Sequence, residues 1–334
     1  MKKILGLAVL LILLAGGSWI LMNNDTANTF DKKGSVFTIK NTDEVNKIVI
    51  KDFEGVEREL KRFSDGENWV IDGRYFVRPD AMDVLLETLE RMTIYAPIPA
   101  EAKENVEKSM QNQGRVVWIY EDDKLIKEII MGAGAPKGNG TYMKVAGQEQ
   151  AYIVNIPGFN GFLHRRFFTD LEEWRDRTVF NIAAKDIASV SVDYMLHPNH
   201  SFTLVNKGND IEVKSAVNKE DKTVNKLVAR QYIGEFEDMY IEAFDNYYSH
   251  KDSVLNESPV CKIAVTDKAG KETEMTIYPM FVNERSKSMF DPQGNPLKYD
   301  RDHYYALINK DQDFVVIQEY VFGKLFKKYE EFVN

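Results

Sequence analysis

The sequence predicts an α+β protein: two similar units in tandem, each a largely antiparallel sheet with one or two helices, preceded by one N-terminal transmembrane helix. Three observations predict it: an uncharged N-terminal run, a residue pattern that occurs twice, and alternating strands interrupted by amphipathic helices. With 334 residues the chain exceeds the ~250–300 residues that one core usually serves. We therefore expect an anchor and tether at residues 1–33, a first unit at 34–180 and a second unit at 181–334.

The N-terminal run, residues 4–22, contains no charged residue. A helix that rises about 1.5 Å per residue spans roughly 30 Å over this length, which matches the hydrocarbon core of a bilayer. Lys2 and Lys3 precede the run and Asp25 follows it, a charge distribution that keeps the N-terminus inside. The sequence thus predicts a single pass through the inner membrane, with the bulk of the chain in the periplasm.

Two alternatives concern the fate of this run. A lipoprotein would need a cysteine after the small residues that end the apolar run, and Gly17 stands there instead. A cleaved signal peptide with Ala15 and Gly17 as its small residues stays open. Cleavage would leave the apolar residues 19–22 exposed at the mature N-terminus, so we favour an uncleaved anchor with Trp19 near the membrane interface.

The repeated pattern is clearest in two segments, 141–154 and 303–316, which align without a gap and pair Thr141 with His303. The same register pairs Gly161 with Gly323, and we expect both glycines to enter or lie within a short helix. Looser matches upstream pair residues 45–50 with 187–192, 92–96 with 239–243, and 117–120 with 261–265. Chance similarity is the alternative, and the gapless stretch argues against it.

Alternation and end signals predict the elements of each unit. Residues 47–51 and 69–71 alternate as strands do, and Ser64 to Gly66 form a turn. Pro79 opens a helix whose inward stripe is Met82, Leu85, Leu86 and Leu89. The matching helix of the second unit is expected at residues 218–233, with Val224, Leu227 and Val228 inward. Short helices are expected near 158–168 and 320–332.

Composition excludes several classes of site. The net charge of −9 argues against a nucleic-acid partner, which would need a basic surface. Cys261 is the one cysteine; it excludes an intramolecular disulfide and a multi-cysteine metal site, and we interpret it as a small buried residue. His197 and His200 have no evident third ligand nearby. We expect no metal and no cofactor.

Catalytic signatures are missing from the sequence, which has neither a Gly-x-Ser-x-Gly elbow nor a His-Glu-x-x-His helix. The glycine-rich stretch 132–141 differs from a phosphate-binding loop because Lys137 precedes its glycine and a strand follows. We interpret it as a connecting loop. His303 falls opposite Thr141 in the repeat, so we interpret that histidine as occupying a generic position.

The junction between the units carries Trp174, Arg175, Asp176 and Arg177. These residues could clamp an anionic or planar ligand. They could equally form a structural clasp, with Trp174 buried between the units and Asp176 paired with an arginine or capping a helix. We favour the clasp because a junction must bury apolar surface and fix an angle.

Several motifs together resemble the domain-of-unknown-function 4340 family, in its Bacteroidota form. They are the run 138–143, Ile156 to Phe159, residues 174–178, the segments 37–40 and 48–50, and the strand 69–71. The resemblance covers roughly residues 35 to 215. It carries no known activity and no catalytic residues to this chain, and it implies an envelope accessory role, since some members occur beside components of ABC-type transport systems.

Two functions of different classes are compatible with these observations. The first is a non-catalytic binding or scaffolding protein, tethered to the inner membrane through residues 4–22 and working with a protein partner in the cell envelope. The alternative is an envelope hydrolase that acts on peptidoglycan, glycan or lipid. The missing signatures favour the first.

Overall fold

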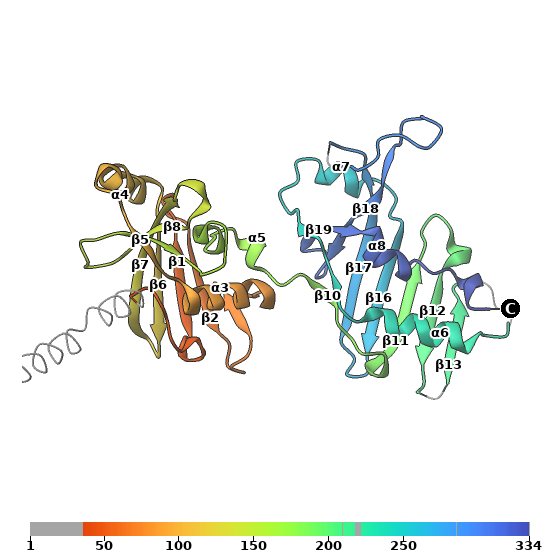
Figure 1. Ribbon diagram of the computed structural model, residues 1–334. Helices are drawn as coiled ribbons and strands as arrows, with labels where there is room; N and C mark the ends of the chain where they lie inside the picture. Colours follow the sequence, from red (N-terminus) through yellow and green to blue (C-terminus); the bar gives the residue numbers. More distant parts are fainter. Residues whose placement is uncertain (1–35, 209, 218–221, 285, 334) are drawn as a thin grey trace, which may run out of the picture. The chain divides into compact units, whose positions relative to one another are not determined.

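The computed structural model describes residues 36–208, 210–217, 222–284 and 286–333 (Figure 1). The chain divides into two compact units between Asp176 and Arg177, close to the expected end of the first unit at residue 180. The predicted anchor at residues 4–22 lies outside the described residues. Within those ranges, no helix is both long enough and apolar enough to span a bilayer.

The first unit contains one nine-stranded sheet with the order β4-β3-β2-β1-β6-β7-β8-β9-β5. Its strands are β1 (Lys47–Lys51), β2 (Glu57–Arg62), β3 (Trp69–Ile71), β4 (Tyr75–Phe76), β5 (Thr93–Pro97), β6 (Arg115–Glu121), β7 (Lys124–Gly134), β8 (Thr141–Val145) and β9 (Tyr152–Asn155). In β1 the alternate residues Ile48 and Ile50 are buried, as expected of a strand with one face on a core. Each of these strand pairs is antiparallel, as the sequence predicts.

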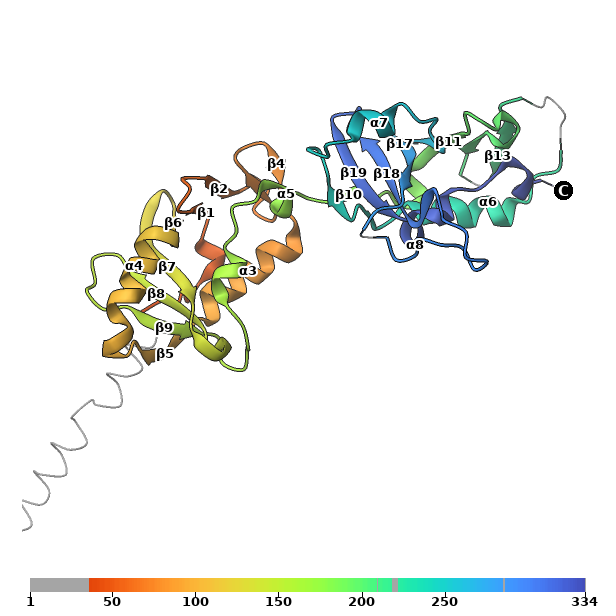
Figure 2. The ribbon, with the colours of Figure 1, turned by 90° about the horizontal axis from the view of Figure 1, so that it is seen from above.

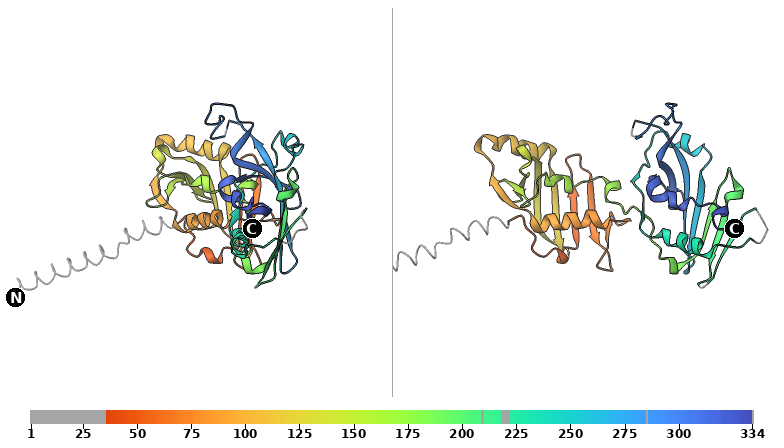
Figure 3. Two further views of the ribbon diagram at one scale, coloured as in Figure 1. Left: turned by 90° about the vertical axis from the view of Figure 1, so that its right-hand side faces the viewer. Right: turned by 45° about the vertical axis from the view of Figure 1, so that its right-hand side comes forward.

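Two helices of the first unit cover its sheet. They are α3 (Pro79–Arg91) and α4 (Lys103–Gln113); α5 (Leu171–Trp174) and the 3-10 turns Thr42–Glu44, Ala100–Ala102, Pro136–Gly138 and Leu163–Arg166 complete the unit. Pro79 begins α3, and the predicted stripe is confirmed, since Met82, Leu85 and Leu89 are buried and Leu86 packs beside them. Figure 3 shows α3 lying across the strands. This stripe supplies one wall of the first core.

The second unit repeats the plan with an eight-stranded antiparallel sheet, in the order β13-β12-β11-β16-β17-β18-β19-β15. Its strands are β11 (Ile187–Asp193), β12 (Phe202–Asn206), β13 (Ile211–Ser215), β15 (Ala243–Phe244), β16 (Cys261–Asp267), β17 (Glu272–Phe281), β18 (Tyr299–Ile308) and β19 (Asp313–Gln318). A separate pair joins β10 (Thr178–Phe180) to β14 (Met239–Tyr240). The fold class is therefore α+β with two large, mostly antiparallel sheets.

The main helix of the second unit is shorter than predicted. The helices are α6 (Lys226–Ile233), α7 (Lys251–Leu255) and α8 (Glu319–Phe322), with 3-10 turns at Ala184–Asp186, Pro198–His200, Gly234–Phe236, Gly323–Leu325 and Tyr329–Glu331. The Asn225 side chain caps α6 by accepting a hydrogen bond from the Val228 amide. The buried residues of α6 are Ala229, Tyr232 and Ile233, and Val224 and Val228, also predicted inward, are partly buried and pack against the same core. Leu227, predicted inward, is 67% exposed, so that prediction is wrong.

The two short helices predicted after the last strands are also reduced. The segment 158–168 contains only the 3-10 turn Leu163–Arg166, because Gly158 (φ +81°) and Gly161 (φ +157°) adopt conformations that a helix does not allow. The segment 320–332 is broken into three single turns. In the first segment, Gly161 lies two residues before the 3-10 turn Leu163–Arg166. Gly323 opens the second turn of the other segment, as expected.

The gapless alignment of residues 141–154 with 303–316 is wrong by one residue. It places Met143 on Tyr305, but Met143 belongs to the main core of the first unit whereas Tyr305 lies in a separate small cluster. The residue of β18 that occupies the main core at this level is Ala306. A slip of one residue turns a strand's side chains to the opposite face. His303 therefore does not occupy the place of Thr141.

Each sheet has a second, smaller cluster on the face away from its main core. In the first unit α4 covers this face with Val106 and Met110. In the second unit the shorter α7 covers it with Val254, against Met280, Tyr305 and Phe314. Figure 2 shows α7 on one side of the second sheet and α6 and α8 on the other. We call the face beside α7 the outer face of the second sheet; the candidate site lies there.

Candidate functional site

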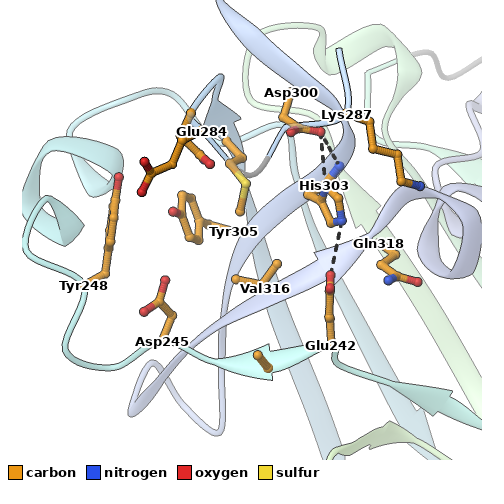
Figure 4. Close-up of a pocket in the computed structure, with 13 residues that line it drawn as sticks. Glu242, Asp245, Tyr248, Glu284, Lys287, Asp300, His303, Tyr305, Val316 and Gln318 are labelled. Carbon is orange, nitrogen blue, oxygen red and sulfur yellow. Dashed lines mark hydrogen bonds and ion pairs between the residues drawn. The ribbon is translucent and has the colours of Figure 1, made fainter. Parts of the chain in front are cut away.

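The imidazole of His303 lies between two carboxylates. Its Nδ1 atom is 3.2 Å from Oδ1 of Asp300, and its Nε2 atom is 3.3 Å from Oε2 of Glu242 (Figure 4). The His303 side chain is only 16% exposed. An ionised carboxylate accepts hydrogen bonds and donates none, so the ring can donate to both carboxylates only in its doubly protonated form.

Asp300 is a buried carboxylate that the backbone holds in place. Its Oδ1 atom accepts hydrogen bonds from the amides of Asp302 (2.7 Å) and His303 (3.0 Å). Oδ2 is buried and has no hydrogen-bond partner within the described residues, and the Ser286 hydroxyl interacts with the carboxyl group. Burial alone would raise the pKa of Asp300, but Ser286, the Asp302 amide and His303 outweigh it and leave the pKa lowered.

Two elements bring these groups together. Strand β18 carries Asp300 and His303, and the segment after β14 carries Glu242. The Glu242 amide donates to the Val316 carbonyl of β19 (2.9 Å), which fixes the segment along the sheet edge. Further along, the Asp245 amide donates to the Phe314 carbonyl (2.8 Å). Glu242 and Asp245 thereby face the same outer surface as His303.

A pocket of about 480 Å³ surrounds His303, a volume within the range of small-ligand sites. Its lining residues are Glu242, Ala243, Asp245, Tyr248, Met280, Asn283, Glu284, Lys287, Asp300, His303, Tyr305, Val316 and Gln318. The rings of Tyr248 and Tyr305 stack with centroids 5.2 Å apart, and Tyr305 stacks in turn on Phe314 at 4.7 Å. One wall of the pocket is therefore aromatic.

The charges in this pocket are unevenly placed. Among the described residues, four carboxylates line it, against one lysine and His303. Figure 4 shows Asp245, Glu284 and the two tyrosines on one side of His303, with Lys287 on the other. Carboxylates beside aromatic faces attract cations, through charge and through the ring quadrupole. The carboxylate side of the pocket therefore suits a positively charged group.

No group of three or more histidine, cysteine, aspartate or glutamate side chains within the described residues is arranged to hold a metal ion. His200, one of the two histidines noted in the sequence, lies 2.8 Å from a carboxylate oxygen of Glu330. Cys261 is fully buried, as expected, and burial raises the pKa of its thiol to about 12.

The residues predicted at the junction lie in defined places. Trp174 ends α5 and is fully buried among residues of the first core, where its ring stacks on Phe168 at 4.1 Å. Its Nε1 atom donates to the Phe168 carbonyl (2.8 Å). Trp174 thus packs as a structural residue does, and the core it fills is that of the first unit.

The three residues that follow Trp174 are anchored by their neighbours. Arg175 is 4% exposed, pairs with Glu172 (3.1 Å) and lies over the ring of Tyr75 at 4.0 Å. The Asp176 amide donates to a carbonyl of β4 (2.8 Å), and the Arg177 carbonyl accepts from an amide next to β14 (2.9 Å). The structure assigns backbone roles to both, and a ligand role for any of the four stays a prediction.

Sequence reasoning missed the His303 pocket for two reasons. The one-residue error in the repeat hid the orientation of His303. The pocket also needs Glu242, Glu284 and Asp300 to converge from three separate segments, which periodicity does not predict. The signal that could have found it is the spacing of Asp300, His303 and Tyr305, of which the last two share one face of a strand.

The fold and pocket define an α+β protein with two antiparallel sheets and an acidic, aromatic-walled pocket on the second. The chain matches the family described as "Domain of unknown function (DUF4340)" over residues 69–256, more than half its length, and so belongs to that family. The match begins at β3 and ends just after α7. Neither the curated proteins nor the solved structures gave a match. The family expected from the motifs is confirmed, over a different span.

Proposed function

We propose that the chain is a non-catalytic binding protein of the cell envelope, tethered to the inner membrane by residues 4–22 and exposed to the periplasm. The uncharged run flanked by lysines supports the tether. The association of family members with ABC-type transport systems supports an accessory role beside such a complex. We also infer that the two units are copies of one ancestral unit, which the matching strand orders support.

One observation supports binding most directly: the acidic, aromatic-walled pocket on the outer face of the second sheet. We infer that it receives a primary amine or guanidinium group, such as a lysine or arginine side chain of a protein partner. Glu242, Asp245 and Glu284 supply negative charge, and Tyr248 and Tyr305 supply aromatic faces. The pocket volume of about 480 Å³ is large enough for one such side chain.

The surroundings of His303 favour binding over catalysis. In a hydrolase of the Ser-His-Asp kind, one imidazole nitrogen faces the orienting carboxylate and the other faces the nucleophile. Here the second nitrogen faces Glu242 instead. A general base already held by a second carboxylate is poorly placed to accept a proton from a hydroxyl or a water.

The alternative, an envelope hydrolase, has one observation in its favour. The Asp300–His303 pair is the arrangement that orients a catalytic histidine, and rotation of the exposed Glu242 side chain would free Nε2. A hydrolase would lose its turnover in His303→Gln. A binding protein would retain most of its affinity for an amine in that variant, because the carboxylates remain.

The test is a titration of the full-length protein in detergent with a lysine-rich tripeptide and with the same peptide acetylated on its side chains. We expect the free amine to bind and the acetylated peptide to bind at least ~10-fold more weakly, since acetylation removes the charge. Glu284→Gln and Glu242→Gln should weaken binding. Glu235→Gln, whose carboxylate pairs with Lys324 outside the pocket, is the matched control. Equal binding of both peptides would contradict the proposal.

The topology has its own test. A reporter that is active only outside the cytoplasm, fused after Asn334, should be active in cells. A silent periplasmic reporter together with an active cytoplasmic one would overturn the export proposal while leaving the amine pocket untouched.

A further inference from the structure

We propose that the first unit carries a separate anion site, a pocket around Arg115 and His164 that binds the oxyanion of a phosphate group. The pocket has a volume of about 390 Å³. Its lining residues are Phe53, Asn112, Gln113, Arg115, Met131, Gly132, Ala133 and His164. None of them is acidic, although the protein as a whole carries a net charge of −9.

Arg115 is the centre of this anion site. Its Nη1 atom donates to the His164 carbonyl (2.7 Å), and no carboxylate among the described residues forms an ion pair with it. Its Nε atom is buried and makes no hydrogen bond within the described part of the chain. A guanidinium with donors left unpaired is the usual receptor for a phosphate or carboxylate, which it can bind through two parallel hydrogen bonds.

His164 supplies the second polar group, and the fold holds it rigidly. The backbone of the turn that carries it is fixed by Thr141, whose Oγ1 atom accepts from the amides of Leu163 (2.8 Å) and His164 (3.3 Å). The ring stacks on Phe162, with centroids 5.6 Å apart. Its Nδ1 atom is buried with no hydrogen-bond partner in the described ranges. Unpaired buried polar atoms destabilise a fold, and an oxyanion would accept a hydrogen bond from Nδ1 in the tautomer that carries its proton on that atom.

The remaining walls fit the same ligand. Asn112 and Gln113 line the pocket from the end of α4. Gly132 and Ala133 lie where the pairing of β7 with β8 shifts register, at a β-bulge of the kind that often borders functional sites. A Cβ at Gly132 would come within 2.9 Å of the Met110 side chain, so glycine keeps α4 close to the pocket. The glycine-rich stretch interpreted as a connecting loop therefore begins in this pocket.

This site belongs to the first unit alone. Val117 pairs with Ile129 as Ile263 pairs with Met275, so the place of Arg115 in the second unit is taken by the buried Cys261. The second unit folds without an arginine at this position, so the fold alone does not explain Arg115. Anion binding explains it, and this site is independent of the amine pocket, which lies in the other unit.

The test uses the full-length protein in nanodiscs of zwitterionic lipid, titrated by calorimetry with inorganic phosphate at constant ionic strength. We expect binding that Arg115→Gln weakens by at least ~10-fold, since the arginine supplies the main charge. His164→Gln should weaken it less and keeps the carbonyl that anchors Arg115. Arg91→Gln, on the exposed side of α3, is the matched control and should bind as the wild type does.

Two further arms complete the test. Arg115→Gln also removes the hydrogen bond to the 3-10 turn that carries His164. Arg115→Lys is therefore measured beside it, together with the melting temperature of each variant. An unchanged melting temperature with lost phosphate binding supports the site. Nanodiscs containing an anionic lipid identify the source: competition with free phosphate indicates a lipid headgroup, and no competition indicates a soluble phosphate compound. Absence of phosphate binding in the wild type, or equal binding in Arg115→Gln, overturns the proposal.

Discussion

His303 Nδ1 lies 3.2 Å from Oδ1 of Asp300, and that same oxygen accepts the backbone amide of His303 at 3.0 Å. Ring and backbone of one residue are thus fixed by one carboxylate. Asp300 is itself fixed by the Asp302 amide. The imidazole therefore has little rotational freedom, and substitution of Asp300 should alter the position of the ring in the pocket.

The first prediction concerns acid stability. The pKa of Asp300 is lowered in the folded protein from an ordinary value of 3.8. A lowered pKa stabilises the fold above the unfolded value, and this stabilisation is lost as the pH falls through the folded value. Asp300→Asn should therefore be less stable than the wild type above about pH 4, with the difference shrinking in more acidic solution. Urea unfolding across this range measures it, and a constant difference would contradict it.

The second prediction concerns Trp174. Removing a buried tryptophan side chain typically costs about 3–5 kcal/mol, so Trp174→Ala should lower the melting temperature clearly. Tyr320→Ala is the control, because Tyr320 is 95% exposed and its loss should change stability by less than about 0.5 kcal/mol. An unchanged melt for Trp174→Ala would instead favour the ligand-clamp hypothesis.

The third prediction separates two leucines that the sequence pattern treats alike. Leu85 of α3 is fully buried, whereas Leu227 of α6 is 67% exposed. Leu85→Ala should lower the free energy of unfolding by about 2–5 kcal/mol. Leu227→Ala should change it by less than about 0.5 kcal/mol. Chemical denaturation of both variants decides whether α6 has the orientation described.

The fourth prediction concerns the buried hydroxyl of Thr141. Thr141→Val keeps the shape of the side chain but removes the acceptor for the Leu163 amide, which lies 2.8 Å away. Leaving a buried amide unpaired costs about 1–3 kcal/mol. Thr141→Ser, which retains the hydroxyl, should recover part of this loss. If valine and serine destabilise equally, packing rather than the hydrogen bond is responsible.

The fifth prediction concerns the pKa of His164. Burial lowers this pKa from its ordinary value of 6.5, and the positive charges of Arg115 and Arg165 lower it further. Arg115→Gln removes one of those charges, so the pKa of His164 should rise in the variant. An NMR titration of the imidazole protons measures it. A pKa that falls or stays unchanged would show that Arg115 does not act on the ring.

Local pattern predicted several elements correctly. Strands β1, β3 and β8 occupy the predicted residues because their alternate side chains meet one core. The inward stripe of α3 is confirmed for the same kind of reason. In contrast, α4 has only Val106 and Met110 as buried residues, which is too few to produce a recognisable helical period. Its burial is decided by the sheet that it covers.

Neither pocket could be predicted from local pattern. Each depends on segments that are distant in sequence and that meet only when the strands pair. Arg115 and His164 illustrate this, since the first begins β6 and the second lies in a 3-10 turn after β9. The lack of a hydrogen-bond partner for the buried Nε atom of Arg115, within the described residues, is a property of the assembled sheet.

The one-residue shift between the two sheets also restricts which substitutions the first unit can accept. Once the shift is applied, the residue of the first unit that corresponds to His303 is Gly140. Gly140 adopts a φ of +131°, and a Cβ there would lie 2.3 Å from the Val154 carbonyl oxygen. Substitution of histidine for Gly140 would therefore require the β8–β9 hairpin to move. The backbone at Gly140 thus excludes the His303 arrangement from the first unit.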